Sequence, residues 1–168
     1  MDRRDQKFMA EALKEAEKSA LLDEVPVGAV IVKNDKIIAR GHNLREKKND
    51  PTLHAEIVAI RKACKKLKSW RLEGCTIYVT IEPCAMCAGT LLWTRIDRIV
   101  FGANDPKGGA IGSSFNLFEF KNINHHPKIT RGVLDEKCGI LMTSFFRNKR
   151  TKEFEQCIDF LLHLRRKS

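Results

Sequence analysis

The sequence predicts a single α/β domain, and three observations lead to this prediction. The chain has 168 residues, which lies within the roughly 100–200 residues that one hydrophobic core usually spans. Hydrophobic residues make up 43% of it, enough to fill such a core. A β-rich run at 76–81, a helical stretch at 84–94 and a second β-rich run at 98–101 follow in close succession. This order is typical of a βαβ crossover, in which two strands pair in parallel and helices cover the sheet.

The first half of the chain is predicted to contain two helices and a hairpin. Apolar residues recur at helical spacing through 3–21, with charged residues between them, which predicts an amphipathic helix. The β-rich runs at 27–32 and 36–40 flank the polar pair Asn34-Asp35 and predict a hairpin. After a charged loop, helical periodicity returns over 52–66.

The second half is predicted to continue the sheet and to end in helices. The run 76–81 consists almost entirely of β-forming residues, as expected for a buried strand. It leads directly into Pro83, and we expect a helix to begin there because proline is favoured in the first turn. Residues 103–116 form a glycine-rich loop, and 135–165 are expected to form one or two helices.

Positive charge is concentrated in two segments of the chain. The net charge is +10, from 31 Lys and Arg against 21 Asp and Glu. Residues 33–72 carry 12 basic and 4 acidic side chains, and residues 121–168 carry 11 and 5, whereas the rest is slightly acidic. Such an excess indicates a polyanionic partner, either nucleic acid or a membrane surface. The alternative is that these charges are solvated helix ends without a partner.

The N-terminus and the six cysteines indicate the compartment. The N-terminus lacks the apolar segment of a secretory signal, and no stretch approaches the roughly 18 apolar residues of a membrane-spanning helix. We therefore expect a cytoplasmic protein without membrane association, whose cysteines are thiols or metal ligands rather than disulfides. Four cysteines have no assigned chemistry and are expected to be small buried hydrophobes: Cys64, Cys75, Cys138 and Cys157.

Two short patterns together predict a catalytic zinc site. Cys84 and Cys87 are three positions apart in the first turn of a predicted helix, so they share a face and can hold one cation. The helix dipole favours their thiolate forms. His54, at the start of another helix, adds a neutral third ligand. Three protein ligands leave the fourth tetrahedral position of Zn²⁺ open, as in catalytic rather than structural zinc sites.

Glu56 is the predicted proton carrier of this site. It lies two residues after His54 and is not needed as a ligand. Beside a water that zinc has acidified to a pKa of about 7, a carboxylate can take up the proton and deliver it to the substrate. The alternatives are a redox-active Cys-x-x-Cys, a structural zinc site and an ordinary histidine at a helix start. A structural site needs a fourth protein ligand, and no further His or Cys pairs with His54 at a suitable spacing.

The order of these two patterns resembles the signature of zinc-dependent base deaminases. Further blocks, spread over about residues 5–150, make the chain similar to the bacterial tRNA-specific adenosine deaminases. The blocks are Glu24-Val25-Pro26-Val27-Gly28-Ala29-Val30, Asp50-Pro51-Thr52-Leu53-His54-Ala55-Glu56-Ile57, Tyr78-Val79-Thr80-Ile81-Glu82-Pro83-Cys84-Ala85-Met86-Cys87-Ala88-Gly89, Phe101-Gly102-Ala103-Asn104-Asp105, Gly109-Ala110-Ile111-Gly112-Ser113, Asn124-His125 and Ser144-Phe145-Phe146-Arg147.

This resemblance implies the architecture of the chain and its reaction. The implied fold is a three-layer, cytidine-deaminase-like α/β fold, with a central mixed sheet of about five strands flanked by helices. Residues 1–150 would be the zinc-dependent deaminase domain, and 151–168 a basic C-terminal helical extension of it. The implied reaction converts the wobble adenosine of a tRNA anticodon, of the arginine ACG type, to inosine and releases ammonia. The implied partners are the tRNA anticodon arm and a second copy of the chain in a homodimer.

The resemblance also assigns roles to individual residues. It implies one Zn²⁺ per chain, with His54, Cys84 and Cys87 as ligands and Glu56 as the catalytic proton shuttle. Asn43 matches a substrate-contacting asparagine, whose amide can both donate and accept hydrogen bonds; the alternative is a turn-forming asparagine. The other implied substrate-binding residues are Val27, Ala55, Asp105, Lys107, His125, Phe145 and Arg147.

Three of these assignments have a chemical reason or an alternative. A carboxylate at Asp105, near the substrate sugar, can accept a hydrogen bond from a 2′-hydroxyl and so favour RNA over DNA. Lys107 is expected to contact phosphate, and the alternative is a solvated loop lysine. The two adjacent aromatic residues Phe145 and Phe146 are expected near the pocket, and the alternative is that they belong to the core.

Three departures from the family pattern bear on the choice of substrate. Leu53 stands where a small residue is usual, Trp93 stands where a smaller or polar residue is common, and His126-Pro127 alters the segment after His125. An aromatic residue near Trp93 is also found in guanine deaminases, so deamination of guanine or of a free nucleoside is the second hypothesis. The third hypothesis, a nucleic-acid-binding zinc module without catalysis, leaves Glu56 without a role.

Overall fold

The computed structural model describes the backbone of residues 2–165 and the side chains of residues 2–151. Its elements, in chain order, are α1 (Arg3–Leu21), β1 (Gly28–Lys33), β2 (Lys36–His42), α2 (Arg45–Lys48), α3 (Ala55–Leu67), β3 (Cys75–Ile81), α4 (Ala85–Trp93), β4 (Arg98–Ala103), the 3₁₀ turn η1 (Leu117–Glu119), β5 (Lys128–Thr130) and α5 (Asp135–Arg165). The predicted helices at 3–21 and 52–66 correspond to α1 and α3, and the predicted hairpin corresponds to β1 and β2.

The strands form one mixed sheet of five strands, in the order β2-β1-β3-β4-β5. β1 pairs antiparallel with β2 and with β3, whereas β3, β4 and β5 pair in parallel. The hairpin turns through Asn34 and Asp35, whose positive φ angles of 49° and 58° match the tight turn that joins antiparallel strands. The crossover from β3 through α4 to β4 is the predicted βαβ unit, and the mixed five-stranded sheet is confirmed.

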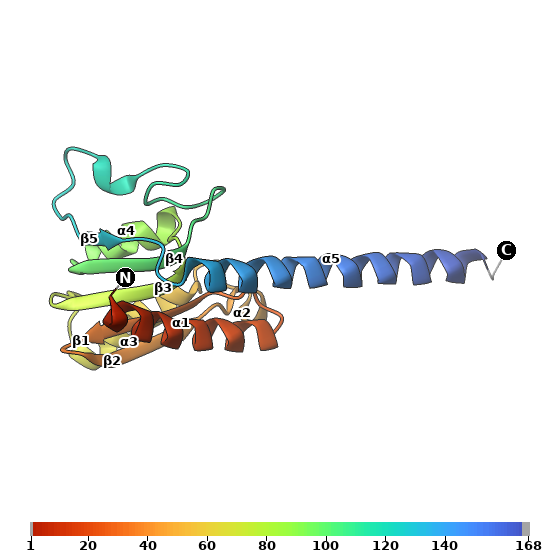
Figure 1. Ribbon diagram of the computed structural model, residues 1–168, viewed down its shortest axis with the longest axis horizontal. Helices are drawn as coiled ribbons and strands as arrows, with labels where there is room; N and C mark the ends of the chain where they lie inside the picture. The colour runs from red at the N-terminus through yellow and green to blue at the C-terminus, as the bar shows by residue number, and fades with distance from the viewer. Residues whose placement is uncertain (1, 166–168) are drawn as a thin grey trace.

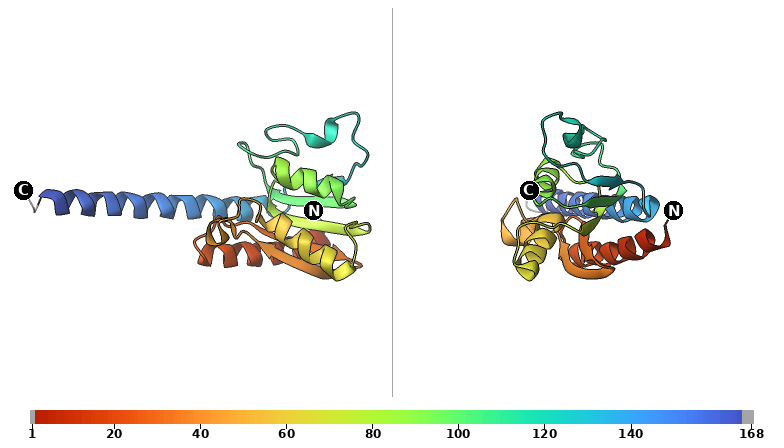
Figure 2. Two further views of the ribbon diagram at one scale, coloured as in Figure 1. Left: turned by 180° about the vertical axis from the view of Figure 1, so that it is seen from behind. Right: turned by 90° about the vertical axis from the view of Figure 1, so that its left-hand side faces the viewer.

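Helices cover both faces of this sheet, which gives three layers. α1 and the first turns of α5 lie on one face, and α3 and α4 lie on the other (Figures 1 and 2). Side chains alternate between the two faces along each strand: Ile31 of β1 packs on the α3 side and Val30 packs on the α1 side. The three-layer α/β fold is therefore confirmed.

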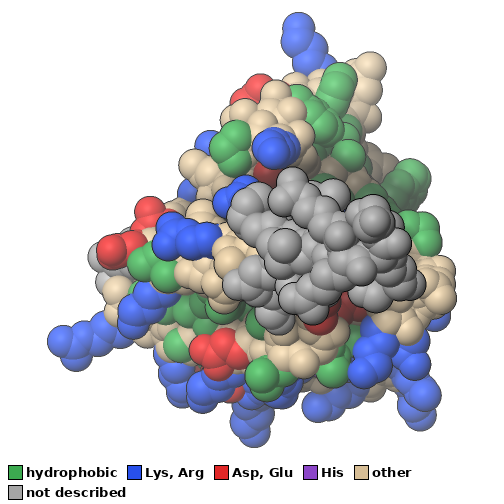
Figure 3. Space-filling model, turned by 90° about the vertical axis from the view of Figure 1, so that its right-hand side faces the viewer, with side chains coloured by type: hydrophobic (Ala, Val, Ile, Leu, Met, Phe, Trp, Pro, Cys, Tyr) green, Lys and Arg blue, Asp and Glu red, His purple; other side chains and the backbone are tan. Residues whose placement is uncertain are grey.

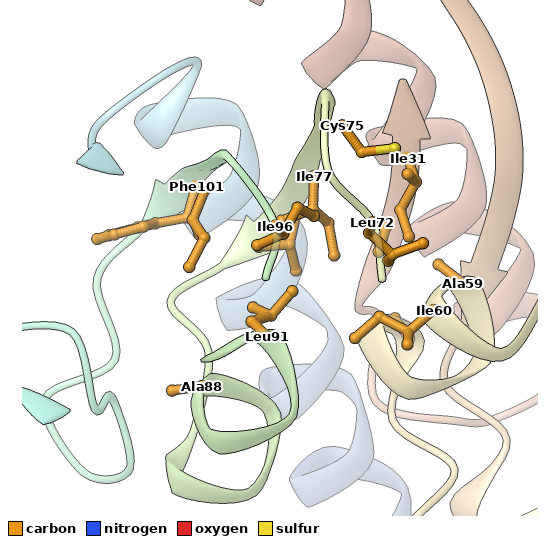
Figure 4. Packing of buried hydrophobic residues seen from close by; sticks show 14 of the residues in the cluster. Ile31, Ala59, Ile60, Leu72, Cys75, Ile77, Ala88, Leu91, Ile96 and Phe101 are labelled. Carbon is orange, nitrogen blue, oxygen red and sulfur yellow. The ribbon is translucent and has the colours of Figure 1, made fainter. Parts of the chain in front are cut away.

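The larger core lies between the sheet and the helices α3 and α4 (Figure 4). Ile77 of β3 and Leu91 of α4 are fully buried there, with Ile60 of α3 beside them. A methyl group at Gly41 of β2 would lie 2.2 Å from the carbonyl oxygen of Ala55, so only glycine lets the first turn of α3 approach the sheet this closely. This close packing holds the N-terminal end of α3 in a fixed position at one end of the sheet.

One feature differs from the sequence-based expectations. Cys84 is the N-cap of α4, with extended backbone, and the helix itself begins at Ala85, so only Cys87 lies in the first turn.

The C-terminal region, expected to form one or two helices, forms one continuous helix, α5, which extends far beyond the domain (Figure 1). The position between residues 150 and 151, where the extension is expected to begin, lies within this helix, and residues 166–168 lie outside the described part of the chain.

Cysteine burial partly follows the expectation. Cys75 and Cys138 are buried, Cys64 is half-buried, and the side chain of Cys157 lies outside the described residues. None of the helices in the described part of the chain has the length and apolar character needed to cross a membrane.

Candidate metal centre and active site

A cavity of about 570 Å³ opens where the N-terminal ends of α3 and α4 meet the end of β3. Its walls come from seven parts of the chain: the segment before β1, the segment after β2, the start of α3, the end of β3, the start of α4, the loop after β4, and α5. The lining residues are Val25, Val27, Asn43, Arg45, His54, Ala55, Glu56, Ile81, Glu82, Cys84, Asp105, Lys107, Met142, Thr143, Phe146 and Arg150. This volume is in the range of pockets that hold small organic ligands.

Three metal-ligating side chains converge at the bottom of this cavity. His54 is the N-cap of α3, Cys84 is the N-cap of α4, and Cys87 follows in the first turn of α4. The His54 Nδ1 atom lies 3.6 Å from Cys84 Sγ and 3.7 Å from Cys87 Sγ. Tetrahedral zinc with ordinary Zn–N and Zn–S bonds places such atoms about 3.6 Å apart. The donor set and its spacing therefore fit Zn²⁺, which these residues would hold through Nδ1 of the histidine.

Contacts among the two thiols and the imidazole shift the pKa values of all three groups. The pKa of Cys84 is lowered to about 4, first by its hydrogen bond with Cys87 and then by its contact with His54, although burial opposes this. The pKa of His54 is raised, chiefly by the same hydrogen bond with Cys84. The pKa of Cys87 is raised by its contact with Cys84 and by burial. One thiolate is thus already stabilised, and a bound cation favours the deprotonated form of both thiols.

Glu56 lies in the first turn of α3, within the cavity wall and almost fully buried. Its Oε2 atom is the one buried side-chain polar atom without a hydrogen-bond partner among the described residues. Burial raises the pKa of Glu56 to about 7. A carboxyl group with such a pKa can both accept and donate a proton near neutral pH, which is the property of a general acid–base group.

Glu82 holds the loop that carries Asp105. This buried carboxylate follows β3 directly and accepts hydrogen bonds from the backbone N–H groups of Asp105, Ile111 and Ser113, at 3.2, 2.9 and 3.0 Å, and from the Ser113 hydroxyl. Burial alone raises the pKa of Glu82, but these hydrogen bonds outweigh it and hold the pKa below its ordinary value. The glycine-rich loop is thereby fixed over the cavity, with Asp105 and Lys107 in its wall.

The structure brings most of the sequence-predicted site residues together. The cavity wall contains the ligands His54 and Cys84, the catalytic candidate Glu56, and five of the implied substrate-binding residues: Val27, Asn43, Ala55, Asp105 and Lys107. Cys87 is buried beside them, within the ligand cluster.

Three implied substrate-binding residues lie elsewhere. On α5, Phe146 and Arg150 line the cavity, whereas Phe145 and Arg147 do not. Phe145 lines a smaller adjoining depression of about 260 Å³, together with Lys149. The His125 ring nitrogen Nε2 lies 2.7 Å from the backbone oxygen of Ile96, away from the cavity wall.

The departures noted in the sequence also lie outside the cavity wall. Trp93 is 68% exposed at the end of α4. Leu53 is half-buried just before the ligand His54, and neither Leu53 nor His126-Pro127 belongs to the cavity lining.

Two buried carboxylates near the site received no role in the sequence analysis. Glu24 and Glu82 are both nearly inaccessible to solvent, and each accepts hydrogen bonds from a segment that borders the cavity. The sequence feature that could have identified them is an acidic residue next to an apolar strand: Glu24 lies shortly before β1, and Glu82 lies directly after β3. Burying a charged side chain is costly unless it is paired or hydrogen-bonded, so such residues are candidates for structural or functional roles.

Comparisons with known proteins agree with this geometry. The family model for the cytidine and deoxycytidylate deaminase zinc-binding region matches residues 2–103. The chain is similar to a tRNA-specific adenosine deaminase from Bacillus subtilis (strain 168), with 50% identity over 149 residues, covering 89% of this chain and 92% of the relative. A tRNA-specific adenosine deaminase from Haemophilus influenzae is 47% identical over 150 residues, with 89% and 87% covered.

Solved structures give the same relationship. A structure from a study of A-to-I editing by tRNA:A34 deaminases at the wobble position of transfer RNA matches with a TM-score of 0.78 and 43% identity, covering 80% of this chain and 98% of that chain. A guanine deaminase from Bacillus subtilis matches with a TM-score of 0.58 and 31% identity, covering 88% and 95%. Similarity in both sequence and structure is thus greater to the tRNA deaminase than to this guanine deaminase.

Proposed function

Because the chain belongs to the cytidine and deoxycytidylate deaminase family and, within it, to the tRNA-specific adenosine deaminases, we propose that it deaminates adenosine at the wobble position of tRNA. The observation that carries this proposal is the convergence of His54, Cys84 and Cys87 with the buried Glu56 in one cavity. Adenosine and water are converted to inosine and ammonia. The enzyme is therefore a hydrolase with one zinc ion per chain.

His54, Cys84 and Cys87 would hold the zinc ion, which when bound would supply Lewis-acid chemistry and lower the pKa of water to about 7. Glu56 then performs the proton transfers. Its carboxylate takes one proton from the water whose oxygen bonds to C6 and delivers this proton to N1 of adenine. It then takes the proton of the resulting C6 hydroxyl group and delivers it to the 6-amino group, so that the C6–N6 bond breaks and ammonia leaves. Because its pKa is about 7, Glu56 can carry the proton in both directions.

The other cavity residues are proposed to hold the nucleotide. Val27 and Ala55 contribute apolar surface beside the base, and Asn43 contributes an amide that can hydrogen-bond to base or ribose. Asp105 is proposed to accept the 2′-hydroxyl, and Lys107 to contact a phosphate. Phe145 and Arg147 lie on α5 outside the cavity wall, so they are proposed to contact neighbouring parts of the anticodon loop. His125 lies beside Ile96, just before β4, at the end of the parallel strands opposite to the cavity, and is not proposed as part of this contact.

Basic side chains around the cavity support the proposal that an RNA backbone binds at the cavity end of the molecule. Arg45, Lys107 and Arg150 lie on the cavity wall, and Lys149 lies in the adjoining depression. Figure 3 looks at the side from which α5 protrudes, and Lys and Arg side chains surround this face. We therefore propose the tRNA anticodon arm as the partner, of the arginine ACG type, and a cytoplasmic location where such tRNA is found.

The proposed homodimer is supported by exposed aromatic side chains on one part of the surface. Trp93 at the end of α4 is exposed, as are Phe115 and Phe120 on either side of η1, and η1 packs against α4. Exposed apolar groups gathered in this way are typical of protein–protein contacts. Sedimentation of the purified protein at micromolar concentration should give a dimer, and a monomer would contradict this part of the proposal.

The substrate is tested directly with purified protein. After incubation with arginine tRNA bearing the anticodon ACG, sequencing should show inosine at the wobble position, while free guanine should not be deaminated. The Glu56→Ala variant, purified identically, serves as the control for contaminating activity. Rapid guanine turnover without inosine would show instead that the chain is a guanine deaminase.

A further inference from the structure

The carboxylate of Glu24 is completely buried beside the cavity. It accepts three hydrogen bonds, from the backbone N–H groups of Lys47 and Glu46, at 2.7 and 3.2 Å, and from the Asn43 side-chain nitrogen at 3.2 Å. All three donors belong to the short segment between β2 and α3, which contributes Asn43 and Arg45 to the cavity wall. Glu24 itself does not line the cavity.

The two backbone hydrogen bonds fix the position of the Glu24 carboxylate. Glu46 and Lys47 lie in the first turn of α2, whose N-cap residue Leu44 provides no side-chain cap. Their N–H groups have no partner within the helix, and the carboxylate of Glu24 supplies one for each. Because one of its oxygens is bound to each N–H group, the carboxylate cannot rotate without breaking a hydrogen bond.

This fixed carboxylate determines the orientation of the Asn43 amide. A side-chain amide presents a donor NH₂ on one side and an acceptor oxygen on the other, and packing alone distinguishes them poorly because they have nearly the same shape. Both oxygens of Glu24 accept hydrogen bonds from backbone N–H groups, and Oε2 also accepts one from the NH₂ group of Asn43, so this NH₂ group faces Glu24. Asn43 is only 5% exposed and lines the cavity, so its remaining hydrogen-bonding capacity is directed within this confined space.

We propose that Glu24 is a positioning residue for substrate binding and that it acts by orienting the amide of Asn43. The proposal rests on the proposed function, in which Asn43 contacts the substrate. Glu24 does not touch the substrate, and its effect on the reaction passes through Asn43. A substitution that removes the acceptor while keeping the shape of the side chain therefore disturbs recognition without disturbing the zinc ligands.

A double-mutant cycle with Glu24→Gln and Asn43→Ala tests this route. Glutamine replaces one acceptor oxygen of Glu24 by an NH₂ group, which cannot accept the hydrogen bonds that the backbone and Asn43 donate to Glu24. The Asn43 amide therefore loses its fixed orientation, and kcat/KM should fall by about 10- to 100-fold. In the Asn43→Ala background, Glu24→Gln should reduce kcat/KM by less than about threefold, because the group through which it acts is gone. Equal reductions in both backgrounds would overturn the proposal.

The matched control is Glu82→Gln, which alters the other buried carboxylate that fixes a cavity segment. Its hydrogen bonds go to the loop from Asp105 to Ser113 and not to Asn43, so its effect should be the same with and without Asn43→Ala. All variants should retain one zinc per chain. If Glu24→Gln does not fold, Glu24→Asp replaces it in the cycle, since it keeps the charge but shortens the side chain.

A second measurement does not depend on activity. The side-chain amide signals of Asn43 in a ¹⁵N–¹H spectrum, identified by their loss in Asn43→Ala, should shift in Glu24→Gln and stay unchanged in Glu82→Gln. Unshifted signals would overturn the proposed orientation. If the wild type deaminates guanine and not tRNA, the proposed function is wrong, and the same cycle measured on guanine still decides the role of Glu24.

Discussion

The two ends of α3 carry opposite kinds of polar side chain. At the N-terminal end, His54 and Glu56 lie in the cavity wall, and Glu56 is buried with its pKa raised to about 7. At the C-terminal end, Lys65 and Lys66 are exposed, and Trp70, just beyond the helix, is 58% exposed. At 1.5 Å per residue, these lysines lie about 15 Å along the helix from Glu56.

Burial explains what this difference means for function. Burying a polar group costs its full desolvation free energy, so such a group is found only where hydrogen-bond partners offset this cost or where the chemistry needs it. Substituting a buried polar group therefore has a large effect. An exposed charge is solvated and screened by salt, so a single one contributes little to the free energy of binding, and an effect arises only from several such charges together. Substitutions should therefore have effects that decrease from the buried end of α3 to its exposed end.

The largest effect is expected for Glu56→Ala. This variant should keep one zinc per chain and fold normally, while kcat falls by about 10²- to 10⁴-fold because the proton transfers lose their carrier. Zinc content by mass spectrometry and inosine formation on the tRNA measure the two properties separately. Cys87→Ala is the contrasting variant, since it should lose both zinc and activity. Loss of zinc from Glu56→Ala would mean that Glu56 is a ligand.

An intermediate effect is expected on α5, at the opposite wall of the cavity. Phe146 lines the cavity and is 42% exposed, whereas Phe145 packs edge-on against it at 5.5 Å in the adjoining depression. Stacking of a base on an aromatic ring is worth about 1–3 kcal/mol, so Phe146→Ala should raise KM for the tRNA by about 5- to 150-fold. Phe145→Ala is the matched control with a smaller expected increase. The reverse order would assign the main contact to Phe145.

The sequence predicted the chemistry at the buried end well because residue type and spacing determine it. The three ligands and Glu56 come together as soon as the helices α3 and α4 begin near each other, so the sequence needed to predict only this one tertiary contact. The contacts from α5 were predicted less well. Adjacent residues on a helix point about 100° apart, so whether Phe145 or Phe146 faces the cavity depends on how α5 crosses the domain.

The supporting residues were missed for a related reason. Glu24 and Glu82 have the composition of surface residues, and only the three-dimensional structure shows that both are buried and hydrogen-bonded to distant backbone. Likewise, β5 has only three residues, Lys128–Thr130, too few for a hydrophobic pattern to predict a strand. Its pairing with β4 is a tertiary effect that the local sequence does not contain.

The smallest effect is expected at the exposed end of α3, which lies within the basic segment 33–72 of the sequence. Between residues 61 and 71 the chain has six basic and no acidic side chains, and the Arg71 guanidinium stacks on Trp70 at 4.9 Å. Replacing Lys65, Lys66 and Lys68 together by Gln should weaken tRNA binding a few-fold. Each lost phosphate contact should also reduce the slope of log K against log salt by about 0.7, the value for single-stranded nucleic acid.

The control for this surface replaces Lys121, Lys128 and Lys137, three exposed lysines outside α3, and so changes the net charge equally. A reduced slope in the first variant alone means that RNA extends along α3 from the cavity toward Trp70. Equal small changes in both variants mean that only the overall charge matters. In that case the basic end of α3 is a solvated surface, and the RNA is bound entirely at the end of the molecule that holds Glu56.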